Sequence, residues 1–503
     1  MCGICGVWNS TDCTEVRSMV RRMEHRGPDE QGFHQEGKGM LGHARLSIMD
    51  PEGGQQPLCN EDGTIALVAN GEIYNYPQLY DELKSRHTFR TGNDSEVILH
   101  LYEEEGPALI NRLQGMFAFC IIDGPRILLA RDAIGIKPLY FGRGDDGSAL
   151  FTSELKSYTG DEYQLEEFPP GSTFTNTEGF SRFYHVPEPD MMKEREQSPQ
   201  EYAAGLRKIL ERAVKRRLMS DVPVGCFLSG GLDSSIISAM VAREIPEPHT
   251  FSVGLEGSPD LRAARLVADH IGSVHHEYII RREEIPMVLP EVVYHLESYD
   301  QDLVRSSVPT YFTARLASEY VKVILTGEGA DELFGGYTYY KEIEDNGDLH
   351  EELQRSVRSL HNINLQRVDR MTMAHSLEGR VPFLDLRMIA DSLRIPASLK
   401  LYGNPPIEKW VLRKACEDLL PEEIVWRPKE QFDEGTGMTD LLPELAADCF
   451  SEEEAARLME RYPSACLRSR EEAYYFSFFL KRFSGSPHVM KSVARWAERP
   501  DRT

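Results

Sequence analysis

The second half of the chain repeats a strand–loop–helix order that restricts how it can fold. Short apolar runs occur at residues 222–228, 250–255, 275–280 and 321–325, and helical spacing of apolar residues separates them. Consecutive strands that each lead into a helix form a parallel sheet covered by helices. Ligands of such sheets bind beyond the carboxyl ends of the strands. We therefore expect a parallel α/β fold with its binding loops at that edge.

The first half of the chain follows a different pattern. Short apolar runs bounded by Gly, Asn, Asp or Pro alternate irregularly with helical segments, which predicts an α+β domain over residues 2–185. Residues 186–199 are polar, contain three prolines and are typical of a linker. Residues 200–503 form the expected second domain, which becomes mostly helical beyond about residue 345.

Composition excludes several classes of protein. The chain has 503 residues, 41% hydrophobic residues and a net charge of −25, which disfavours nucleic acid and anionic membranes as partners. No apolar run is long enough to span a bilayer, and no secretory signal is visible. Nine scattered cysteines are typical of reduced thiols, so we expect a cytoplasmic protein.

A glycine-rich segment, Ser229-Gly-Gly-Leu-Asp-Ser-Ser235, follows the first strand of the parallel pattern and opens a helix. Glycines let the backbone approach an anion, and serine hydroxyls and the helix N-terminus add hydrogen-bond donors. Asp233 fits such a loop if Mg²⁺ lies between its carboxylate and the phosphates. The segment resembles the phosphate loop of the ATP pyrophosphatases. The alternative is an ordinary glycine-rich turn with serine caps.

A second loop follows the strand at 321–325. Between Thr326 and Gly336 it contains four glycines and the acids Glu328, Asp331 and Glu332, more than a capped helix needs. Asp331 is placed to share a metal with Asp233, and Glu328 to act on an acceptor substrate.

Cys2 is the third notable feature. Removal of Met1 would leave an α-amino group with a pKa of about 8 beside the thiol, so that nucleophile and base share one residue. The alternative is an ordinary cysteine near a chain end. Cys2 and Cys5 also form a C-x-x-C pair, but a zinc site would need a second ligand pair, and none is present.

Further motifs mark the first half: His25-Arg-Gly-Pro-Asp29, Arg45-Leu-Ser-Ile-Met-Asp50, Asn70-Gly-Glu-Ile-Tyr-Asn75 and Gly92-Asn-Asp-Ser-Glu96. With Cys2-Gly-Ile4 and the two loops above, they make nearly the whole chain similar to the glutamine-hydrolysing asparagine synthetases. The resemblance implies a class II glutamine amidotransferase domain with the four-layer αββα sandwich of N-terminal nucleophile hydrolases, followed by a parallel-sheet ATP-pyrophosphatase domain with a helical C-terminal part.

The resemblance also implies roles for individual residues. Cys2 would attack glutamine, while Asn70 and Gly71 would hold the oxyanion. Glutamine would be bound by Arg45, Leu46, Ser47, Ile48, Met49, Glu72 and Asp94. ATP would contact Phe227, Ser229, Gly230, Gly231, Leu232, Asp233, Ser234, Ser235, Val253, Thr326 and Gly327. Asp233 and Asp331 would hold Mg²⁺, and the remaining catalytic residues would be Glu328, Lys429 and Arg305.

The implied reaction has two parts. ATP activates the β-carboxylate of L-aspartate as an acyl-adenylate, and ammonia released from L-glutamine at Cys2 converts it to L-asparagine. Family precedent suggests a homodimer. The segment Arg380-Val-Pro-Phe-Leu-Asp385 matches a family segment that we interpret as structural.

One departure bears on the acceptor substrate. Where close relatives have two hydroxyl residues before the arginine that matches Arg305, this chain has Asp302 and Leu303. An added negative charge would repel aspartate unless it is compensated. One alternative function is therefore an amide synthetase acting on another carboxylate; another is a catalytically silent glutamine- or nucleotide-binding protein, which the presence of every expected catalytic residue disfavours.

Overall fold

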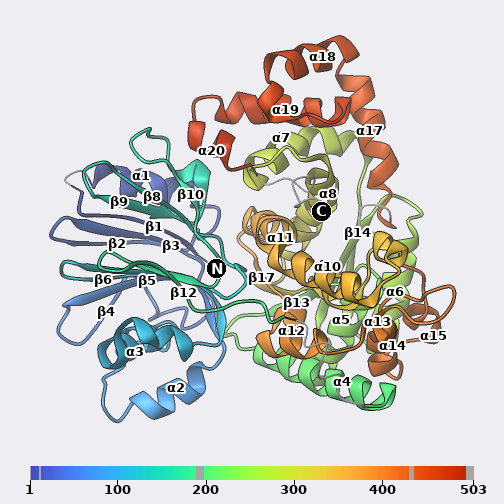
Figure 1. Cartoon of the computed structure of the whole chain (residues 1–503), viewed down its shortest axis with the longest axis horizontal. Helices are drawn as coiled ribbons and strands as arrows, with labels where there is room; N and C mark the ends of the chain where they lie inside the picture. The colour runs from blue at the N-terminus through green and yellow to red at the C-terminus, as the bar shows by residue number, and fades with distance from the viewer. Residues whose placement is uncertain (1, 11–12, 189–196, 430–434, 494–503) are drawn as a thin grey trace.

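A computed structural model describes residues 2–10, 13–188, 197–429 and 435–493 (Figure 1). The predicted linker at 186–199 lies mostly outside these residues, as do residues 430–434, which follow Lys429. The two antiparallel sheets of the N-terminal part lie on one side of Figure 1, and the parallel sheet with most helices lies on the other.

The N-terminal part contains two six-stranded sheets, both antiparallel. The first has the order β10-β8-β9-β1-β3-β2. Its strands are β1 (Gly3–Trp8), β2 (Glu30–Glu36), β3 (Gly39–Arg45), β8 (Tyr140–Arg143), β9 (Ala149–Thr152) and β10 (Glu166–Glu167). The second has the order β12-β11-β7-β6-β5-β4. Its strands are β4 (Leu58–Cys59), β5 (Ile65–Ile73), β6 (Gly115–Asp123), β7 (Arg126–Arg131), β11 (Ser172–Thr175) and β12 (Gly179–Arg182).

Helices cover the outer faces of both sheets. Helix α1 (Thr14–Arg22) packs on the first sheet, and helices α2 (Tyr76–Leu83) and α3 (Glu96–Glu105) cover the second. The two sheets face each other across an apolar core that includes Ile4, Leu41, Val68 and Phe151. The arrangement is a four-layer αββα sandwich, which confirms the predicted fold of this part.

The C-terminal part is built on a five-stranded parallel sheet with the order β15-β14-β13-β16-β17. The strands are β13 (Val224–Phe227), β14 (His249–Gly254), β15 (Val274–Ile279), β16 (Val323–Leu325) and β17 (Glu378–Arg380). Four of them confirm the apolar runs of the sequence. The fifth, β17, lies in a segment that sequence reasoning did not assign to the sheet, because three residues carry too little pattern to be recognised.

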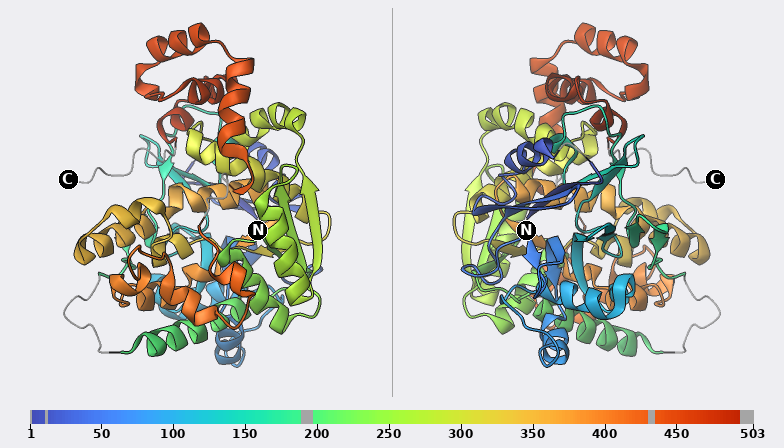
Figure 2. Two further views of the ribbon diagram at one scale, coloured as in Figure 1. Left: turned by 90° about the vertical axis from the view of Figure 1, so that its right-hand side faces the viewer. Right: turned by 90° about the vertical axis from the view of Figure 1, so that its left-hand side faces the viewer.

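Helices surround this sheet and extend to one end of the molecule. Those between and beside the strands are α4 (Pro199–Arg216), α5 (Leu232–Glu244), α6 (Pro259–Ile271), α7 (Ile285–Leu296), α8 (Gln301–Ala317), α9 (Ala330–Phe334), α10 (Asn346–Arg358) and α11 (Asn364–Met373). Then follow α12 (Leu386–Ser392), α13 (Ala397–Lys400), α14 (Trp410–Cys416), α15 (Glu422–Val425), α17 (Met438–Cys449), α18 (Glu452–Arg461), α19 (Arg470–Phe483) and α20 (Pro487–Lys491). Helices α18 and α19 gather at one end of the molecule (Figures 1 and 2).

Local sequence explains where several helices begin. Helix α4 starts with Pro199 after a reciprocal capping box between Ser198 and Glu201, and Asp300 accepts two backbone hydrogen bonds at the start of α8. Among the described residues, no helix combines the length and apolar character needed to cross a membrane.

A buried ion network joins the two parts of the chain. The Arg26 guanidinium lies 2.7 Å from the Asp369 carboxylate on α11 and 2.8 Å from the Glu154 carboxylate. Arg370 continues the network, at 3.0 Å from both Glu154 and Glu297. The side chain of Arg26 is fully buried, and its Nε donates to the carbonyl of Cys2 at 3.1 Å. Because buried charges must stay paired, this network requires the two parts to remain docked.

We predict that Arg26→Met is strongly destabilising. The substitution removes a positive charge beside the buried carboxylates of Asp369 and Glu154. Removing one partner of a buried ion pair lowers the free energy of unfolding by about 3–5 kcal/mol. Urea unfolding of the full chain measures the change. The control is Arg457→Met, which removes an exposed pair with Glu453 and should change stability by less than about 0.5 kcal/mol. Equal effects of the two substitutions would contradict the role of the network.

Candidate functional site

Cys2 and Asn70 meet at the start of the first sheet. Cys2 lies beside β1, and Asn70 lies on β5 of the facing sheet. The backbone nitrogen of Cys2 donates to Asn70 Oδ1 at 3.0 Å, while Asn70 Nδ2 is buried without a hydrogen-bond partner among the described residues. Burial raises the pKa of the Cys2 thiol, so the thiol needs a nearby base to become a nucleophile.

Gly71 follows Asn70 in a conformation that favours glycine. Its φ is +146°, and a Cβ at this position would lie 1.9 Å from the carbonyl oxygen of Met116 on the neighbouring strand. The close strand contact therefore excludes any side chain here. This conformation sets the direction of the Gly71 peptide next to Asn70.

Two buried acids lie close to Cys2. Burial raises the pKa of Asp94 to about 7, although its Oδ2 accepts a hydrogen bond from the Ile73 N–H at 2.5 Å. Burial and the nearby Glu378 also raise the pKa of Glu72 well above its usual range. Both carboxyl groups are therefore easier to protonate than usual. A cation that binds beside them would stabilise their ionised forms, so the pair favours cation binding.

The remaining residues predicted for glutamine lie at the end of β3 and on the segment that follows it. Arg45 is buried and donates to Glu30 at 2.8 Å and to the Asp50 carbonyl at 2.7 Å. The Leu46 carbonyl lies 3.9 Å from the Cys2 sulfur, and the Ser47 N–H is held by Asp29. Leu46 and Ile48 also belong to an apolar cluster that includes Val323 and Met373 of the C-terminal part, with Met49 packed against it.

A second site is a cavity of about 590 Å³ at the carboxyl edge of the parallel sheet. Of the residues predicted from the sequence, twelve line it: Phe227, Ser229, Gly231, Leu232, Asp233, Ser234, Val253, Thr326, Gly327, Glu328, Asp331 and Lys429. Gly230, Ser235 and Arg305 are not among the described lining residues. The two glycine-rich loops, about 100 residues apart in sequence, thus meet at one cavity.

Two lysines and two aspartates form the charged centre of this cavity. Lys409 Nζ lies 2.5 Å from Asp233 and 2.6 Å from Asp331, and Lys429 Nζ lies 3.0 Å from Asp331. Burial alone would raise the pKa of Asp331, but the two lysines hold it well below its usual range. Gly336 permits the close approach, since a Cβ there would lie 1.9 Å from Asp331 Oδ1. Asp233 Oδ1 is buried without a hydrogen-bond partner among the described residues.

Glu328 faces the same cavity and pairs with Arg367 of α11. Burial raises the pKa of Glu328, and the nearby Arg367 opposes that rise. Beside it, burial raises the pKa of Glu332 to about 7, and Glu332 accepts hydrogen bonds from Tyr337 at 2.6 Å and Asn364 at 2.8 Å. Glu328 and Asp331 thus line the cavity beside opposing cations, and Glu332 lies behind them as a third acid.

The residues that depart from the family pattern lie at the start of α8. Asp302 and Leu303 line the cavity. Arg468, which precedes α19, contacts Asp302 at 3.1 Å and Asp300 at 2.9 Å. Arg305 points to Glu471 of α19, with 2.5 Å between their charged atoms. The charge of Asp302 is thus compensated by Arg468, a residue that the sequence did not connect with it.

Strand β17 links the two sites. The Arg380 carbonyl accepts a hydrogen bond from the Thr326 N–H at the cavity, at 2.9 Å. Its guanidinium lies 3.2 Å from Glu72 near Cys2 and 2.6 Å from Glu378. This segment was interpreted from sequence as structural, and it does join sheet and sandwich. It also brings one residue into contact with both candidate sites.

Sequence reasoning missed Lys409, Arg367, Arg380 and Arg468 as site residues. None lies in a glycine-rich loop, and a basic side chain in a helical segment usually faces solvent. One structural signal does mark Lys409: it has a φ of +55° at the start of α14, an unfavourable conformation for a lysine. Such strain is often found at functional positions, but it cannot be read from a sequence.

Comparison with known proteins agrees with this two-site arrangement. A family described as glutamine amidotransferase domain matches residues 1–170, and the asparagine synthase family matches residues 205–348 and 341–488. The chain is 40% identical to asparagine synthetase [glutamine-hydrolyzing] 1 of Arabidopsis thaliana, covering 96% of this chain and 86% of that protein. It is 39% identical to a probable asparagine synthetase [glutamine-hydrolyzing] of Dictyostelium discoideum, covering 99% and 96%.

A similar protein from Asparagus officinalis, also called asparagine synthetase [glutamine-hydrolyzing], is 40% identical over 99% of this chain and 90% of its own length. These matches extend through both sheets of the sandwich, the parallel sheet and the helical C-terminal part. The chain therefore belongs to the family of glutamine-hydrolysing asparagine synthetases.

Proposed function

We propose that this protein converts L-aspartate to L-asparagine with ATP and with ammonia released from L-glutamine. The observation that carries the proposal is the meeting of Asp233, Glu328, Asp331 and Lys429 at one cavity, separate from a buried Cys2–Asn70 pair. Glutamine hydrolysis would occur within residues 2–185 and amide synthesis within residues 200–503. Several buried cysteines, Cys5, Cys120 and Cys226 among them, are free thiols, which supports our proposal of a cytoplasmic location.

Hydrolysis of glutamine begins at Cys2 once Met1 is removed. The nitrogen that now donates to Asn70 Oδ1 becomes the α-amine, which takes the thiol proton as the sulfur attacks the amide carbon. Asn70 Nδ2 and the Gly71 N–H would stabilise the oxyanion, ammonia leaves, and water hydrolyses the thioester. Asp94 and Glu72 would pair with the glutamine α-ammonium, and Arg45 with its carboxylate.

Amide synthesis begins at the larger cavity. The loop at Ser229–Ser235 and the N-terminus of α5 would bind the phosphates of ATP. The donor set also fits a divalent cation, because Asp233 has a buried unpartnered oxygen and Asp331 is held ionised. We propose that these two aspartates hold Mg²⁺, which when bound would neutralise phosphate charge.

The side chains of this protein then act on the reacting groups. The aspartate β-carboxylate attacks the α-phosphorus, the bond to pyrophosphate breaks, and β-aspartyl-AMP forms. Lys429 and Lys409 would stabilise the negative charge on the phosphates. Ammonia then attacks the acyl carbon and AMP leaves. Glu328, kept beside Arg367, is placed to orient the acceptor or accept a proton from ammonia.

The first prediction about activity tests whether glutamine hydrolysis and amide synthesis occur at separate sites. Cys2→Ala should abolish glutamine-dependent synthesis and leave ammonia-dependent synthesis unchanged, because the two sites are separate. Product identification by mass spectrometry with ATP, aspartate and either nitrogen source measures both activities. The control Cys5→Ala removes an equally buried thiol that has no part in the mechanism and should retain both activities. Equal loss of both activities in Cys2→Ala, or an acceptor other than aspartate giving the only product, would refute the proposal.

The second prediction concerns pH. Ionised Asp94 would bind the glutamine α-ammonium, and its pKa of about 7 makes the ionised fraction fall as pH decreases below that value. We expect kcat/KM for glutamine to fall about tenfold per pH unit below about 7. Ammonia-dependent synthesis, with its rate expressed per concentration of unprotonated ammonia, should not show this component.

Asp94→Asn should lower kcat/KM for glutamine about 10- to 100-fold and remove the pH component near 7, since the charge is lost. Asp62→Asn, an exposed position in the same part of the chain, is the control and should keep the profile. An unchanged profile in Asp94→Asn would exclude Asp94 as the titrating group.

The third prediction concerns acceptor recognition. Arg468→Gln should raise KM for aspartate about fivefold, because Asp302 then keeps only the more distant Arg305, at 3.8 Å, and repels a carboxylate by about 1 kcal/mol across the cavity. Adding Asp302→Thr in the same chain should reverse the increase, and KM for ATP should change little. Arg482→Gln, which removes an exposed pair with Glu291, is the control. A KM for aspartate that does not respond to Arg468→Gln, or is not restored by Asp302→Thr, would contradict this compensation.

A further inference from the structure

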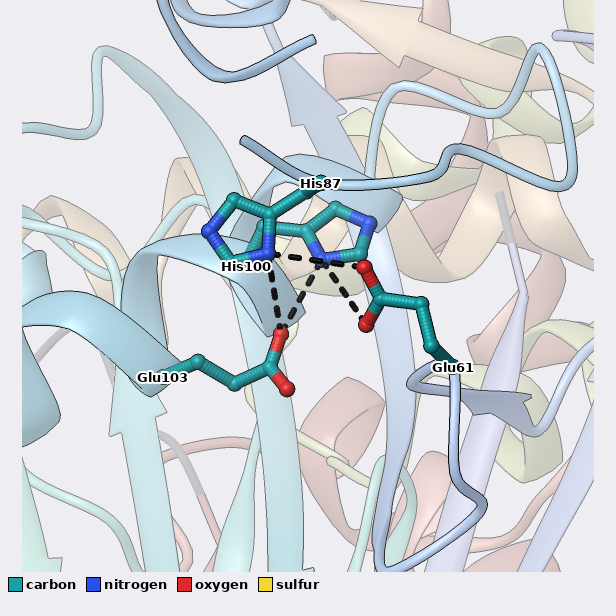
Figure 3. Close-up of side chains that lie close together, drawn as sticks. All are labelled: Glu61, His87, His100 and Glu103. Atoms are coloured by element: carbon teal, nitrogen blue, oxygen red, sulfur yellow. Dashed lines mark hydrogen bonds and ion pairs between the residues drawn. The ribbon is translucent and has the colours of Figure 1, made fainter. Parts of the chain in front are cut away.

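Four potential metal ligands converge on the outer side of the N-terminal sandwich, away from both sites described above. They are Glu61, His87, His100 and Glu103, shown in Figure 3. Glu61 lies between β4 and β5, His87 follows α2, and His100 and Glu103 lie three residues apart on α3. One ligand atom from each side chain can be chosen so that all four lie within 4.8 Å of one another.

Two of the four separations between histidine nitrogens and carboxylate oxygens match those of a tetrahedral site, and the two histidines face different oxygens of Glu61. His87 Nδ1 lies 3.5 Å from Glu61 Oε1 and 3.5 Å from Glu103 Oε2. His100 Nδ1 lies 3.1 Å from Glu103 Oε2 and 3.9 Å from Glu61 Oε2. Bonds of about 2.0–2.2 Å in a tetrahedron place neighbouring ligands about 3.3–3.6 Å apart. Small adjustments of the side chains would therefore suffice to surround one ion.

The histidine nitrogens that face away from the centre are directed to other carboxylates. His87 Nε2 lies 3.0 Å from Glu104, within hydrogen-bond distance, whereas His100 Nε2 is buried without a hydrogen-bond partner among the described residues and lies 3.7 Å from Glu96. In metal sites a carboxylate at this position fixes the tautomer that leaves the opposite nitrogen free to bind the ion. The His100 side chain is 1% exposed, so its orientation is set by packing rather than by solvent.

The two carboxylate ligands are also held by neighbouring groups. Glu61 Oε1 accepts a hydrogen bond from the Thr88 N–H at 2.9 Å, and Glu103 Oε1 accepts one from Asn60 Nδ2 at 2.9 Å. Three of the four ligands thus have a supporting hydrogen bond from outside the cluster, and the fourth, His100, is held by burial. A set of exposed acids that merely gather on a surface lacks such support.

We propose that Glu61, His87, His100 and Glu103 form a structural Zn²⁺ site. Two imidazole nitrogens with two carboxylate oxygens suit zinc, whereas Mg²⁺ and Ca²⁺ prefer oxygen ligands alone. Four protein ligands leave no open position, which indicates a structural role. The alternative is a cluster held by hydrogen bonds between protonated histidines and carboxylates, with no metal affinity.

The ion would join three segments that are separate in sequence. The loop after β4, the chain after α2 and helix α3 would share one centre. The segment between His87 and His100 also contains Asp94. Bound zinc would therefore hold both ends of the segment that contains Asp94, without contacting Cys2.

Metal titration of the full-length protein tests the proposal. After removal of metals with a chelator, calorimetry with Zn²⁺ alone should show one tight equivalent in the Cys2→Ala protein, where that thiol cannot compete. Co²⁺ in place of Zn²⁺ should give the visible absorption of a tetrahedral site without a thiolate charge-transfer band. This signature distinguishes the cluster from the exposed cysteines Cys449 and Cys466.

Variants assign the binding to the cluster. His100→Ala should weaken zinc binding at least about 100-fold, and Glu104→Gln, which keeps every ligand, should weaken it about 10- to 100-fold. His249→Ala is the matched control, because His249 forms a histidine pair with His276 at 2.9 Å on the parallel sheet. Circular dichroism checks that each variant is folded.

Two results would overturn the proposal. One is the absence of a tight zinc equivalent in the Cys2→Ala protein. The other is zinc binding that persists in folded His100→Ala but is lost in His249→Ala, which would place the ion at the other histidine pair.

Discussion

The buried pairing of Arg26 with Asp369 and Glu154 is the interaction on which the rest of the structure depends. It lies where the antiparallel sandwich meets α11, and each of its charges would be costly to bury alone. Arg26 also donates to the carbonyl of Cys2, so the contact that docks the two parts of the chain also positions the proposed nucleophile. The same residue, Arg26, therefore contributes both to the stability of the interface and to the geometry of the proposed glutamine site.

A second connection runs through β17. The backbone of Arg380 hydrogen-bonds to Thr326 at the ATP cavity, while its side chain reaches Glu72 beside the glutamine site. One residue of this short strand thus contacts both candidate sites, which suits the proposed reaction, in which one site consumes what the other releases.

Much of this could be predicted from the sequence. The loops around Asp233 and Asp331 follow strands whose apolar runs are clear, and the rule that parallel strands end at one edge places the two aspartates together. Cys2, Asn70 and Asp94 were recognised because their motifs resemble those of a known family. The parallel sheet and the αββα sandwich were both confirmed.

The positions of the balancing charges could not be predicted in this way. Lys409 contacts both aspartates and Arg468 compensates Asp302, yet neither residue lies in a loop with a recognisable pattern. Likewise, the two histidines and two glutamates beside α3 come from segments with no shared motif. In each case tertiary packing brings together segments that are distant in the sequence. The number of residues between those segments carries no information about the contact.

The sequence by itself determined the two classes of fold and the order of the loops, because apolar periodicity and turn residues act locally along the chain, and its motifs gave the proposed reactive groups. Only the tertiary structure decided which charges face each other. Electrostatic pairing acts through space over a few ångströms, so the partner of a buried acid depends on how distant segments pack rather than on its neighbours in sequence.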